Sequence, residues 1–301
     1  MKRYAMVIDV SRCVGCYSCF LVCRDEHDGN DHLPFAIAQP PGGQKWIDVR
    51  EAERGSFPRA RLSHLPVPCL HCDEAPCVAA GGDALYQRAD GIVLFDPEKS
   101  VGKRELVSTC PHGVIFWNEE RNMPQKCTFC AHLLDEGWKE PRCVEVCPTQ
   151  AIVFGDLNDS ASPVARLNAT GEVETLHPEY GMKPAVRYIG LPKRFAAGEV
   201  VLEDSSDLPA AGIQVSLHGG NKVLTTCTDN YGDFTFERLA DNAEYVLRIE
   251  HPGYGSYQQT FHAQGDLNFG TIVLGCVDGA KDRGMPSPSR RQNGNEVKGA
   301  N

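Results

Sequence analysis

Twelve of the 14 cysteines lie in the first half of the 301-residue chain, and their spacing restricts the possible fold more than any other feature. The first run has separations of two, two and three residues and consists of Cys13, Cys16, Cys19 and Cys23. The last run has a longer gap before its third member and consists of Cys127, Cys130, Cys143 and Cys147. Sulfur donors grouped this densely indicate a loop-rich domain built around metal sites.

The first run matches the Cys-x2-Cys-x2-Cys-x3-Cys pattern of bacterial ferredoxins, in which the fourth cysteine of each run binds the cluster of the other run. Applied to the first and last runs together, this exchange predicts two [4Fe-4S] clusters. The ligands expected for cluster 1 are Cys13, Cys16, Cys19 and Cys147. The ligands expected for cluster 2 are Cys127, Cys130, Cys143 and Cys23.

A second, incomplete pair of runs lies between these two. Its cysteines are Cys69, Cys72, Cys77 and Cys110, and the same exchange predicts cluster 3 on these four. A fourth cluster would need thiolates at positions 81, 100, 103 and 106, which are glycine, serine, lysine and leucine. None of these side chains replaces a soft thiolate, so the sequence indicates that one whole site has been deleted and that three complete sites remain.

Other uses of these cysteines fit the spacing less well. Structural zinc also uses paired Cys-x2-Cys knuckles, but four cysteines within eleven residues favour a cubane over a tetrahedral ion. Disulfides are disfavoured because the N-terminal segment does not resemble a secretory signal peptide. The same observation predicts a cytoplasmic protein, although a folded subunit can also be exported alongside a partner that carries the signal.

Several residues near the runs have a simpler interpretation than metal binding. His64, His71, His112 and His132 lie close to cysteines, but the thiolates already complete three sites, so we interpret these histidines as packing residues or as neighbours of the ligands. Cys227 and Cys276 fall outside the pattern and are interpreted as buried structural cysteines. Lys126 precedes a ligand and could tune a cluster, but a solvated lysine is the simpler interpretation.

The periodicity predicts an α+β fold: a duplicated bacterial-ferredoxin-like cluster domain followed by a small antiparallel β-sandwich. Short β-like segments at 91–96 and 113–117 lie between the cysteine runs, whereas residues 198–274 alternate polar and apolar residues between turn signals. The expected boundaries are a ferredoxin-like iron–sulfur domain at 1–155, a connector wrapping it at 156–194, the β-sandwich at 195–275 and a disordered tail at 276–301.

Composition excludes several classes of function. The formal net charge of −10 and the scattered lysines and arginines argue against nucleic acid as a partner. No apolar run is long enough to cross a bilayer, so direct membrane insertion is not expected. The sequence contains no phosphate-binding glycine loop, nucleophile elbow or convincing acid and base pair, so we expect no catalytic residues and no active site in this chain.

Four ferredoxin-type runs in this order resemble the iron–sulfur subunits of the molybdopterin oxidoreductases of the DMSO reductase family. The segments DVSRC at 9–13, KCTFC at 126–130 and GDLND at 155–159 are typical of that group. A closer resemblance, to small subunits of the pyrogallol–phloroglucinol transhydroxylase type with resorcinol hydroxylase among their relatives, rests on HCDEAPCVA at 71–79, YQR at 86–88, GIV at 91–93, DPEK at 96–99, WNEE at 117–120 and CAHLLD at 130–135.

The resemblance implies a function and a partner. It implies an electron-transfer subunit with three [4Fe-4S] clusters, in a heterodimer with a large catalytic subunit that holds molybdopterin with molybdenum or tungsten and acts on phenolic substrates as a transhydroxylase, hydroxylase or dehydroxylase. It also implies a transthyretin-like or carboxypeptidase-regulatory-like β-domain, cluster 1 nearest the pterin, and loss of the outermost, membrane-facing cluster. The alternatives are a subunit of another molybdopterin reductase or dehydrogenase, a free ferredoxin-like carrier and, more weakly, a binding module centred on the β-domain.

Overall fold

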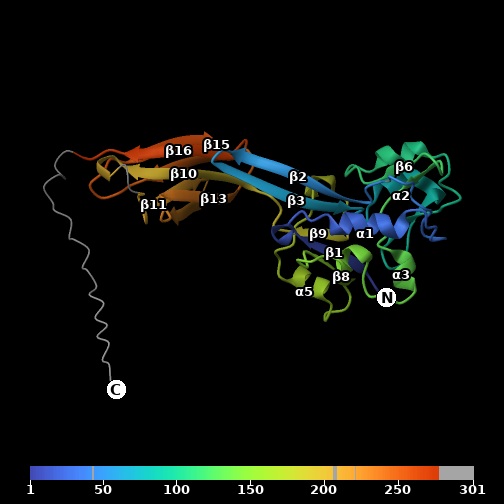
Figure 1. The fold of residues 1–301 in the computed structure, drawn as a ribbon. Coiled ribbons are helices and arrows are strands. Elements are labelled where there is room, and N and C mark those ends of the chain that lie inside the picture. The colour runs from blue at the N-terminus through green and yellow to red at the C-terminus, as the bar shows by residue number, and fades with distance from the viewer. Residues whose placement is uncertain (43, 206–208, 221, 278–301) are drawn as a thin grey trace, which may run out of the picture. The chain divides into compact units, whose positions relative to one another are not determined.

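A computed structural model describes residues 1–42, 44–205, 209–220 and 222–277 (Figure 1). The chain divides into two compact units. The first consists of Met1–Arg54 and Ala60–Pro192, and the second consists of Gly55–Arg59 and the chain from Lys193 onward. The expected disordered tail at 276–301 lies, from residue 278 on, outside the described residues.

The first unit is organised around a three-stranded sheet of order β8-β1-β9. Its strands are β1 (Tyr4–Asp9), β8 (Ile152–Asp156) and β9 (Val186–Ile189), with β8 antiparallel and β9 parallel to β1. Alternate side chains of β1 point to opposite faces. Met6 and Ile8 therefore enter the main core of the unit, whereas Ala5 and Val7 pack against Val164 on the other face.

The segment at 156–194, expected to be a connector, carries regular structure. It contains α5 (Pro163–Ala169), the short helix η4 (Pro178–Tyr180) and β9. Val164 of α5 is fully buried, and Val186 and Tyr188 of β9 are also fully buried. Most of this segment is therefore part of the first unit and closes both its sheet and its core.

Short helices and hairpins surround the sheet and carry the cysteine runs. The helices are η1 (Val10–Arg12), α1 (Ser18–His27), α2 (Pro76–Gly81), η2 (Gly82–Ala84), η3 (Arg104–Thr109), α3 (Ala131–Asp135) and α4 (Arg142–Glu145). The hairpins are β2 (Ile47–Ser56) with β3 (Arg59–Pro68), β4 (Leu85–Gln87) with β5 (Val93–Phe95), and β6 (Phe116–Asn118) with β7 (Met123–Gln125). Packing of α1 against α4 and of α2 against η3 repeats one arrangement twice, as a duplicated ferredoxin unit requires.

The second unit is a sandwich of two sheets. One has the order β13-β10-β16 and the other the order β12-β11-β14-β15. Their strands are β10 (Arg194–Leu202), β11 (Gln214–Gly219), β12 (Lys222–Cys227), β13 (Asp233–Leu239), β14 (Glu244–Ile249), β15 (Tyr257–His262) and β16 (Leu267–Leu274), and a short helix η5 (Glu203–Ser205) follows β10. The expected α+β architecture with a terminal β-sandwich is confirmed.

One pairing in the sandwich differs from the expected antiparallel arrangement. Strand β16 runs parallel to β10, because the chain leaves the other sheet after β15 and enters this edge in the direction of β10. The remaining pairs are antiparallel. Registered pairs such as Val215 opposite Ile249 and Leu217 opposite Leu247 form one wall of a core that the phenylalanines of β13 complete.

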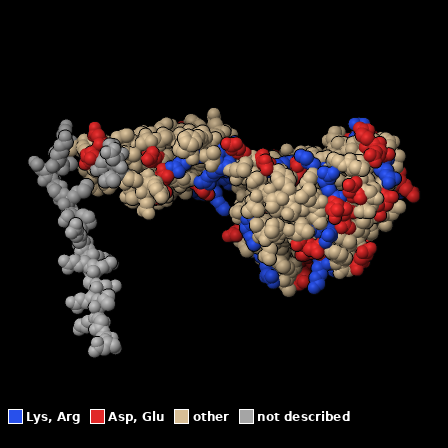
Figure 2. Space-filling view, in the orientation of Figure 1, with Lys and Arg blue, Asp and Glu red and all other residues tan. Residues whose placement is uncertain are grey.

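Surface charge and helix length give two further findings. On the face of the first unit drawn in Figure 2, lysine and arginine side chains are interspersed with aspartate and glutamate and form no continuous basic surface. Within the described part of the chain, no helix combines the length and the apolar character needed to cross a membrane.

The sandwich core makes a matched pair of valine substitutions informative. Val215 on β11 is fully buried, whereas Val223 on the edge strand β12 is 56% exposed. We expect Val215→Ala to lower the free energy of unfolding of the second unit by about 2 kcal/mol, because two buried methyl groups and their packing are lost. Val223→Ala should change it by less than about 0.5 kcal/mol. Calorimetry of both variants measures the difference, and equal effects would contradict the core assignment.

Candidate metal centres

The first predicted set of thiols lines one cavity, formed by Cys13, Cys16, Cys19 and Cys147 with their neighbours. Cys19 lies in the first turn of α1, and Cys147 follows α4, which packs against α1. Gly15 adopts a φ of +65°, and a side chain there would collide with the ring of His64. This tight turn curls the chain around the cavity. The backbone N–H of Ala151 also donates to the sulfur of Cys147 over 3.3 Å.

The second set lines another cavity, formed by Cys23, Cys127, Cys130 and Cys143 together with His27, Trp46 and Phe129. Two consecutive residues of the loop, Phe129 and Cys130, adopt left-handed φ values of 54° and 51°. This backbone bend brings Cys130 back toward Cys127, whose sulfur accepts a hydrogen bond from the N–H of Phe129 over 3.4 Å. Local strain at a ligand loop is characteristic of functional sites.

The third set gathers at the end of β3 and the start of α2. Cys69 and Cys72 are buried in the main core, Cys77 is buried in a small second core, and Cys110 packs against both cores. The electrostatic effect of Cys69, Cys110 and Cys77 on the Cys72 thiol agrees with this proximity. Cys69 also interacts with Cys127 of the second set, so the second and third sites are neighbours. Thus the structure brings together the members of each set of four predicted from the sequence.

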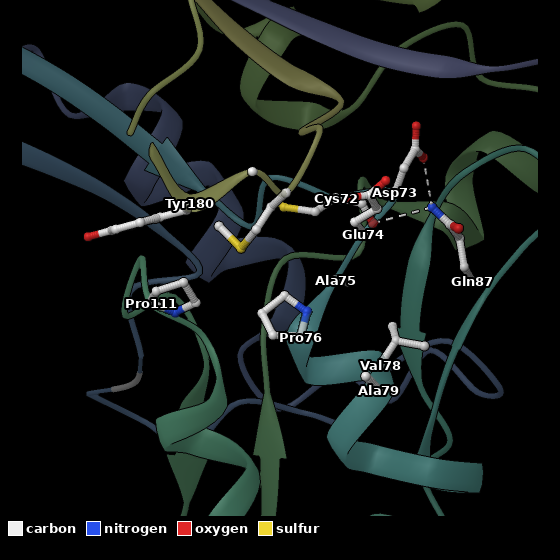
Figure 3. A pocket seen from close by; sticks show the side chains of 12 residues that line it. Cys72, Asp73, Glu74, Ala75, Pro76, Val78, Ala79, Gln87, Pro111 and Tyr180 are labelled. Atoms are coloured by element: carbon white, nitrogen blue, oxygen red, sulfur yellow. Dashed lines mark hydrogen bonds between the residues drawn. The ribbon is translucent and has the colours of Figure 1, made fainter. Parts of the chain in front are cut away.

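The third site adjoins an open groove of about 680 Å³ (Figure 3). Cys72 lies on its wall, with Tyr180 and Pro111 on one side and α2 on the other. The amide of Gln87 donates to the backbone oxygen of Cys72 over 3.4 Å and to Asp73 over 3.2 Å. Cys72, whose thiol is itself buried, therefore forms part of the groove wall beside the third site.

Burial dominates the chemistry of the thiols. It raises the pKa of Cys19, Cys72, Cys127 and Cys130 to about 12, and the neighbouring sulfurs add to the effect. The pKa values of Cys23 and Cys143 lie well above their usual range for the same reason. A metal ligand must be a thiolate, so these sulfurs can ionise only when a bound metal compensates their charge. Four soft donors around a small, largely apolar space, as at the first and second sites, fit an iron–sulfur cluster.

At the position of a fourth site, the side chains are engaged elsewhere. The hydroxyl of Ser100 is buried and donates to the backbone oxygen of Asp96 over 2.6 Å. Lys103 pairs with Asp83 over 3.5 Å, and a side chain added to Gly81 would collide with Leu85. Leu106 is 2% exposed and packs in a small core that also contains Leu85, Phe95, Ile115 and Cys77. Apolar packing fills this region.

The histidines lie beside the cysteine loops. His71 accepts a hydrogen bond at Nδ1 from the N–H of Val93 over 3.0 Å, and its ring contacts that of Phe129 with centroids 3.8 Å apart and planes tilted by 34°. Burial, with smaller contributions from Lys126 and Arg3, holds its pKa well below the usual value, so the ring is neutral. Burial lowers the pKa of His112 to about 4. That these histidines are not cluster ligands stays a prediction.

Lys126 is the clearest correction to the sequence analysis. Expected to be solvated, it is 2% exposed, and its ammonium donates to the backbone oxygens of Val93 and Cys127. The sequence carries no local signal for this burial, which becomes visible only in the structure, where Lys126 directly follows β7 and all three residues of that strand are buried. Cys227, expected to be buried, is exposed on the edge strand β12.

A polar network on α1 was also missed. Glu26 contacts His132 over 3.0 Å and Arg142 over 3.2 Å, and His32 stacks on His132 with centroids 3.8 Å apart and ring planes 16° from parallel. Nε2 of both rings approaches Oε1 of Glu26, at 3.0 Å for His132 and 3.9 Å for His32. The guanidinium of Arg142 supplies a positive charge for the same carboxylate. This network therefore ties α1 to α3 and α4 around the second site.

Comparison with known proteins agrees with this geometry. Residues 60–157 match the 4Fe-4S dicluster domain family, and residues 197–274 match the carboxypeptidase regulatory-like domain family. The chain is 42% identical over 266 residues to the pyrogallol hydroxytransferase small subunit of Pelobacter acidigallici, which covers 86% of this chain and 94% of that protein. The chain belongs to the iron–sulfur subunits of the molybdopterin oxidoreductases. The resemblance drawn from the sequence is confirmed.

Other subunits of this family match about two thirds of the chain. A subunit of the sulfite dehydrogenase of Allochromatium vinosum is 35% identical over 205 residues, which cover 64% of this chain and 85% of that protein. The arsenate respiratory reductase iron–sulfur subunit of a Shewanella species is 30% identical over 236 residues, which cover 62% of this chain and 96% of that protein. The chain is thus an electron-transfer subunit of the molybdopterin oxidoreductase type.

Removal of one thiol tests the third set. We expect Cys110→Ala to lower the iron content by about four atoms per chain, because a cubane held by three thiolates from one loop loses its remaining ligand. Cys227→Ala provides the control, since this exposed cysteine lies in the second unit. Iron analysis of anaerobically purified protein measures both. Unchanged iron in Cys110→Ala would contradict the ligand assignment.

The small apolar core beside the third set generates a second prediction. Leu106→Ala should destabilise this region by about 2–5 kcal/mol, because it removes a buried leucine next to Cys77. An iron chelator should therefore remove iron from the third site faster than in the unsubstituted protein. Val101→Ala, at a position 52% exposed, should leave the release rate unchanged. Equal release rates in both variants would show that the core does not support the site.

Proposed function

We propose that this chain carries three [4Fe-4S] clusters and serves a molybdopterin catalytic subunit that adds, removes or transfers a hydroxyl group on a phenolic ring. The main support is the combination of three complete sets of four converging thiols with 42% identity, along most of the chain, to a pyrogallol hydroxytransferase small subunit. The residues at 81, 100, 103 and 106 offer no thiol, and Leu106 and Ser100 are buried in other contacts, which favours three clusters over four. A partner with molybdenum or tungsten follows from the family.

In this proposal, the clusters supply one-electron oxidation and reduction, and the chain holds them. The proposed ligands are Cys13, Cys16, Cys19 and Cys147 for cluster 1, Cys127, Cys130, Cys143 and Cys23 for cluster 2, and Cys69, Cys72, Cys77 and Cys110 for cluster 3. The polypeptide excludes water from most of these sulfurs and donates backbone N–H groups to some of them. Both effects help to set a cluster potential.

The arrangement of the sets supports a linear electron path. Cys19 and Cys23 lie one turn apart on α1 and belong to the first and second sets, so this helix joins the two sites. The electrostatic coupling of Cys127 with Cys69 joins the second to the third. Electrons would pass along the order 1, 2, 3 or in reverse.

The two ends of this path differ. At the first site, Cys16 is exposed and Val14 and Leu21 are 62% and 59% exposed, which suits an interface with the large subunit. Beyond the third site lies the packed apolar region in place of a fourth cluster. We therefore propose a heterodimer without a quinone-reducing membrane subunit, located in the reducing cytoplasm, where twelve ligand thiols stay available for iron.

Two other functions use the same sites. The first alternative is an electron-transfer subunit of another molybdopterin reductase or dehydrogenase. It is supported by the sulfite dehydrogenase and arsenate reductase subunits among the relatives. A free ferredoxin-like carrier is the second alternative. The match of 94% of the hydroxytransferase small subunit, which includes the β-sandwich region, favours the phenolic enzyme.

Anaerobic purification of the chain expressed with its genomic large-subunit neighbour tests the proposal. We expect a stoichiometric complex that contains molybdopterin and about twelve irons on this chain, and that converts a hydroxylated aromatic substrate. Elution of the chain alone would indicate a free carrier. About eight or sixteen irons would contradict three clusters, and a stoichiometric cytochrome or multi-span membrane subunit would contradict the truncated path. Turnover of an oxyanion such as sulfite or arsenate in place of a phenol would favour the alternative enzymes.

A further inference from the structure

Lys126 occupies an unusual position for a lysine. It lies directly after β7, is 2% exposed, and precedes Cys127 of the second site. Its ammonium donates hydrogen bonds to the backbone oxygens of Val93 and Cys127, the second over 3.2 Å. Lysines are almost never fully buried unless they are paired.

The usual partner is missing. Within the described ranges, no carboxylate forms an ion pair with Lys126, and its contacts are two carbonyl oxygens. A buried cation without an anion is strongly unfavourable. The groups on which its charge acts are instead the thiols of Cys72 and Cys77 in the third set and of Cys127 in the second. The anionic partner of Lys126 is therefore expected at these two sites.

Val93 at the start of β5 fixes the position of this charge. Its C=O accepts from Lys126, and its N–H donates to Nδ1 of His71 over 3.0 Å. His71 lies between two cysteines of the third set, and its ring contacts that of Phe129, which lies between two cysteines of the second set. One residue, Val93, thus holds Lys126 against both cysteine loops.

A second unpaired polar group lies in the same place. Because Nδ1 of His71 accepts from Val93, the hydrogen of the neutral ring is on Nε2, and this buried atom has no hydrogen-bond partner among the described residues. A buried donor without an acceptor is costly. The sulfur atoms of a cluster accept hydrogen bonds. The Lys126 ammonium, which lacks an anion, and the Nε2–H of His71, which lacks an acceptor, therefore both indicate anionic, sulfur-containing groups beside them.

We propose that Lys126 is an electrostatic tuning residue that raises the reduction potentials of clusters 2 and 3 relative to cluster 1. This inference rests on the proposed function and adds which clusters along the electron path have the higher reduction potentials. Each cluster becomes more negative by one electron when it is reduced, so a fixed positive charge nearby stabilises the reduced form. The first site is not part of this arrangement: the described hydrogen bonds of Lys126 and Val93 reach the loops of the second and third sets alone. Electrons are therefore held preferentially at clusters 2 and 3.

The test is a redox titration of the purified complex, followed by electron paramagnetic resonance. Lys126→Met removes the charge, and Lys126→Gln removes it but keeps a donor for Val93, which covers the case in which the methionine variant loses iron. In each variant, we expect the ratio of reduced to oxidised cluster at a fixed potential to fall about tenfold for two of the three waves, those of clusters 2 and 3. This corresponds to a midpoint potential lower by about 59 mV for a one-electron couple. The third wave, from cluster 1, should not move.

Two further variants separate charge from structure. Lys126→Arg keeps the charge and should shift each wave by less than a factor of about three. Lys139→Met removes an exposed lysine and should leave all three waves in place, because an exposed charge is screened. Movement of no wave, of one wave or of all three equally would overturn the inference, as would an equal effect of arginine and methionine. Fewer or more than three waves in the unsubstituted complex would instead count against the proposed function.

Discussion

Ionisation of buried sulfur is the constraint on which the first unit depends. The structure removes most of the ligand thiols from water, and burial raises the pKa of several to about 12. Without metal, such groups remain protonated and pack as small apolar side chains. With metal, the same positions become anionic and need compensating donors and charge. The left-handed loop residues, the backbone N–H donors and the buried ammonium of Lys126 are located where that change occurs.

The fourth position shows what the fold does when the sulfur donors are absent. Leu106 and Leu85 pack with Phe95 and Ile115, and Ser100 turns its hydroxyl to the backbone. The helix pair α2 and η3 persists there, so the duplicated framework is kept by apolar packing together with local polar contacts of Ser100 and Lys103. The side chain of Cys77 belongs to this core. The stability of the third site is therefore coupled to residues that bind no metal.

The sequence predicted the thiol sets because ligand spacing is local and because an exchange rule joins the runs. It also predicted the sandwich, since alternation of buried and exposed residues directly reflects a two-sided sheet. It did not predict β9, because a strand buried at both Val186 and Tyr188 inside a polar, proline-containing segment resembles a connector. The parallel entry of β16 beside β10 and the burial of Lys126 depend on tertiary packing, which no local pattern specifies.

Net charge and local charge act differently on an electron path. The chain has a formal charge of −10, which lowers the potential of every cluster in the same direction, and salt screens much of it. Differences between neighbouring clusters must therefore come from groups that water and ions cannot reach. Lys126 is such a group: it is buried next to Cys127 of the second site and is joined through Val93 to His71 in the loop of the third. One buried cation can impose a gradient along the path that many surface charges cannot, which explains why the fold retains it despite the cost of its burial.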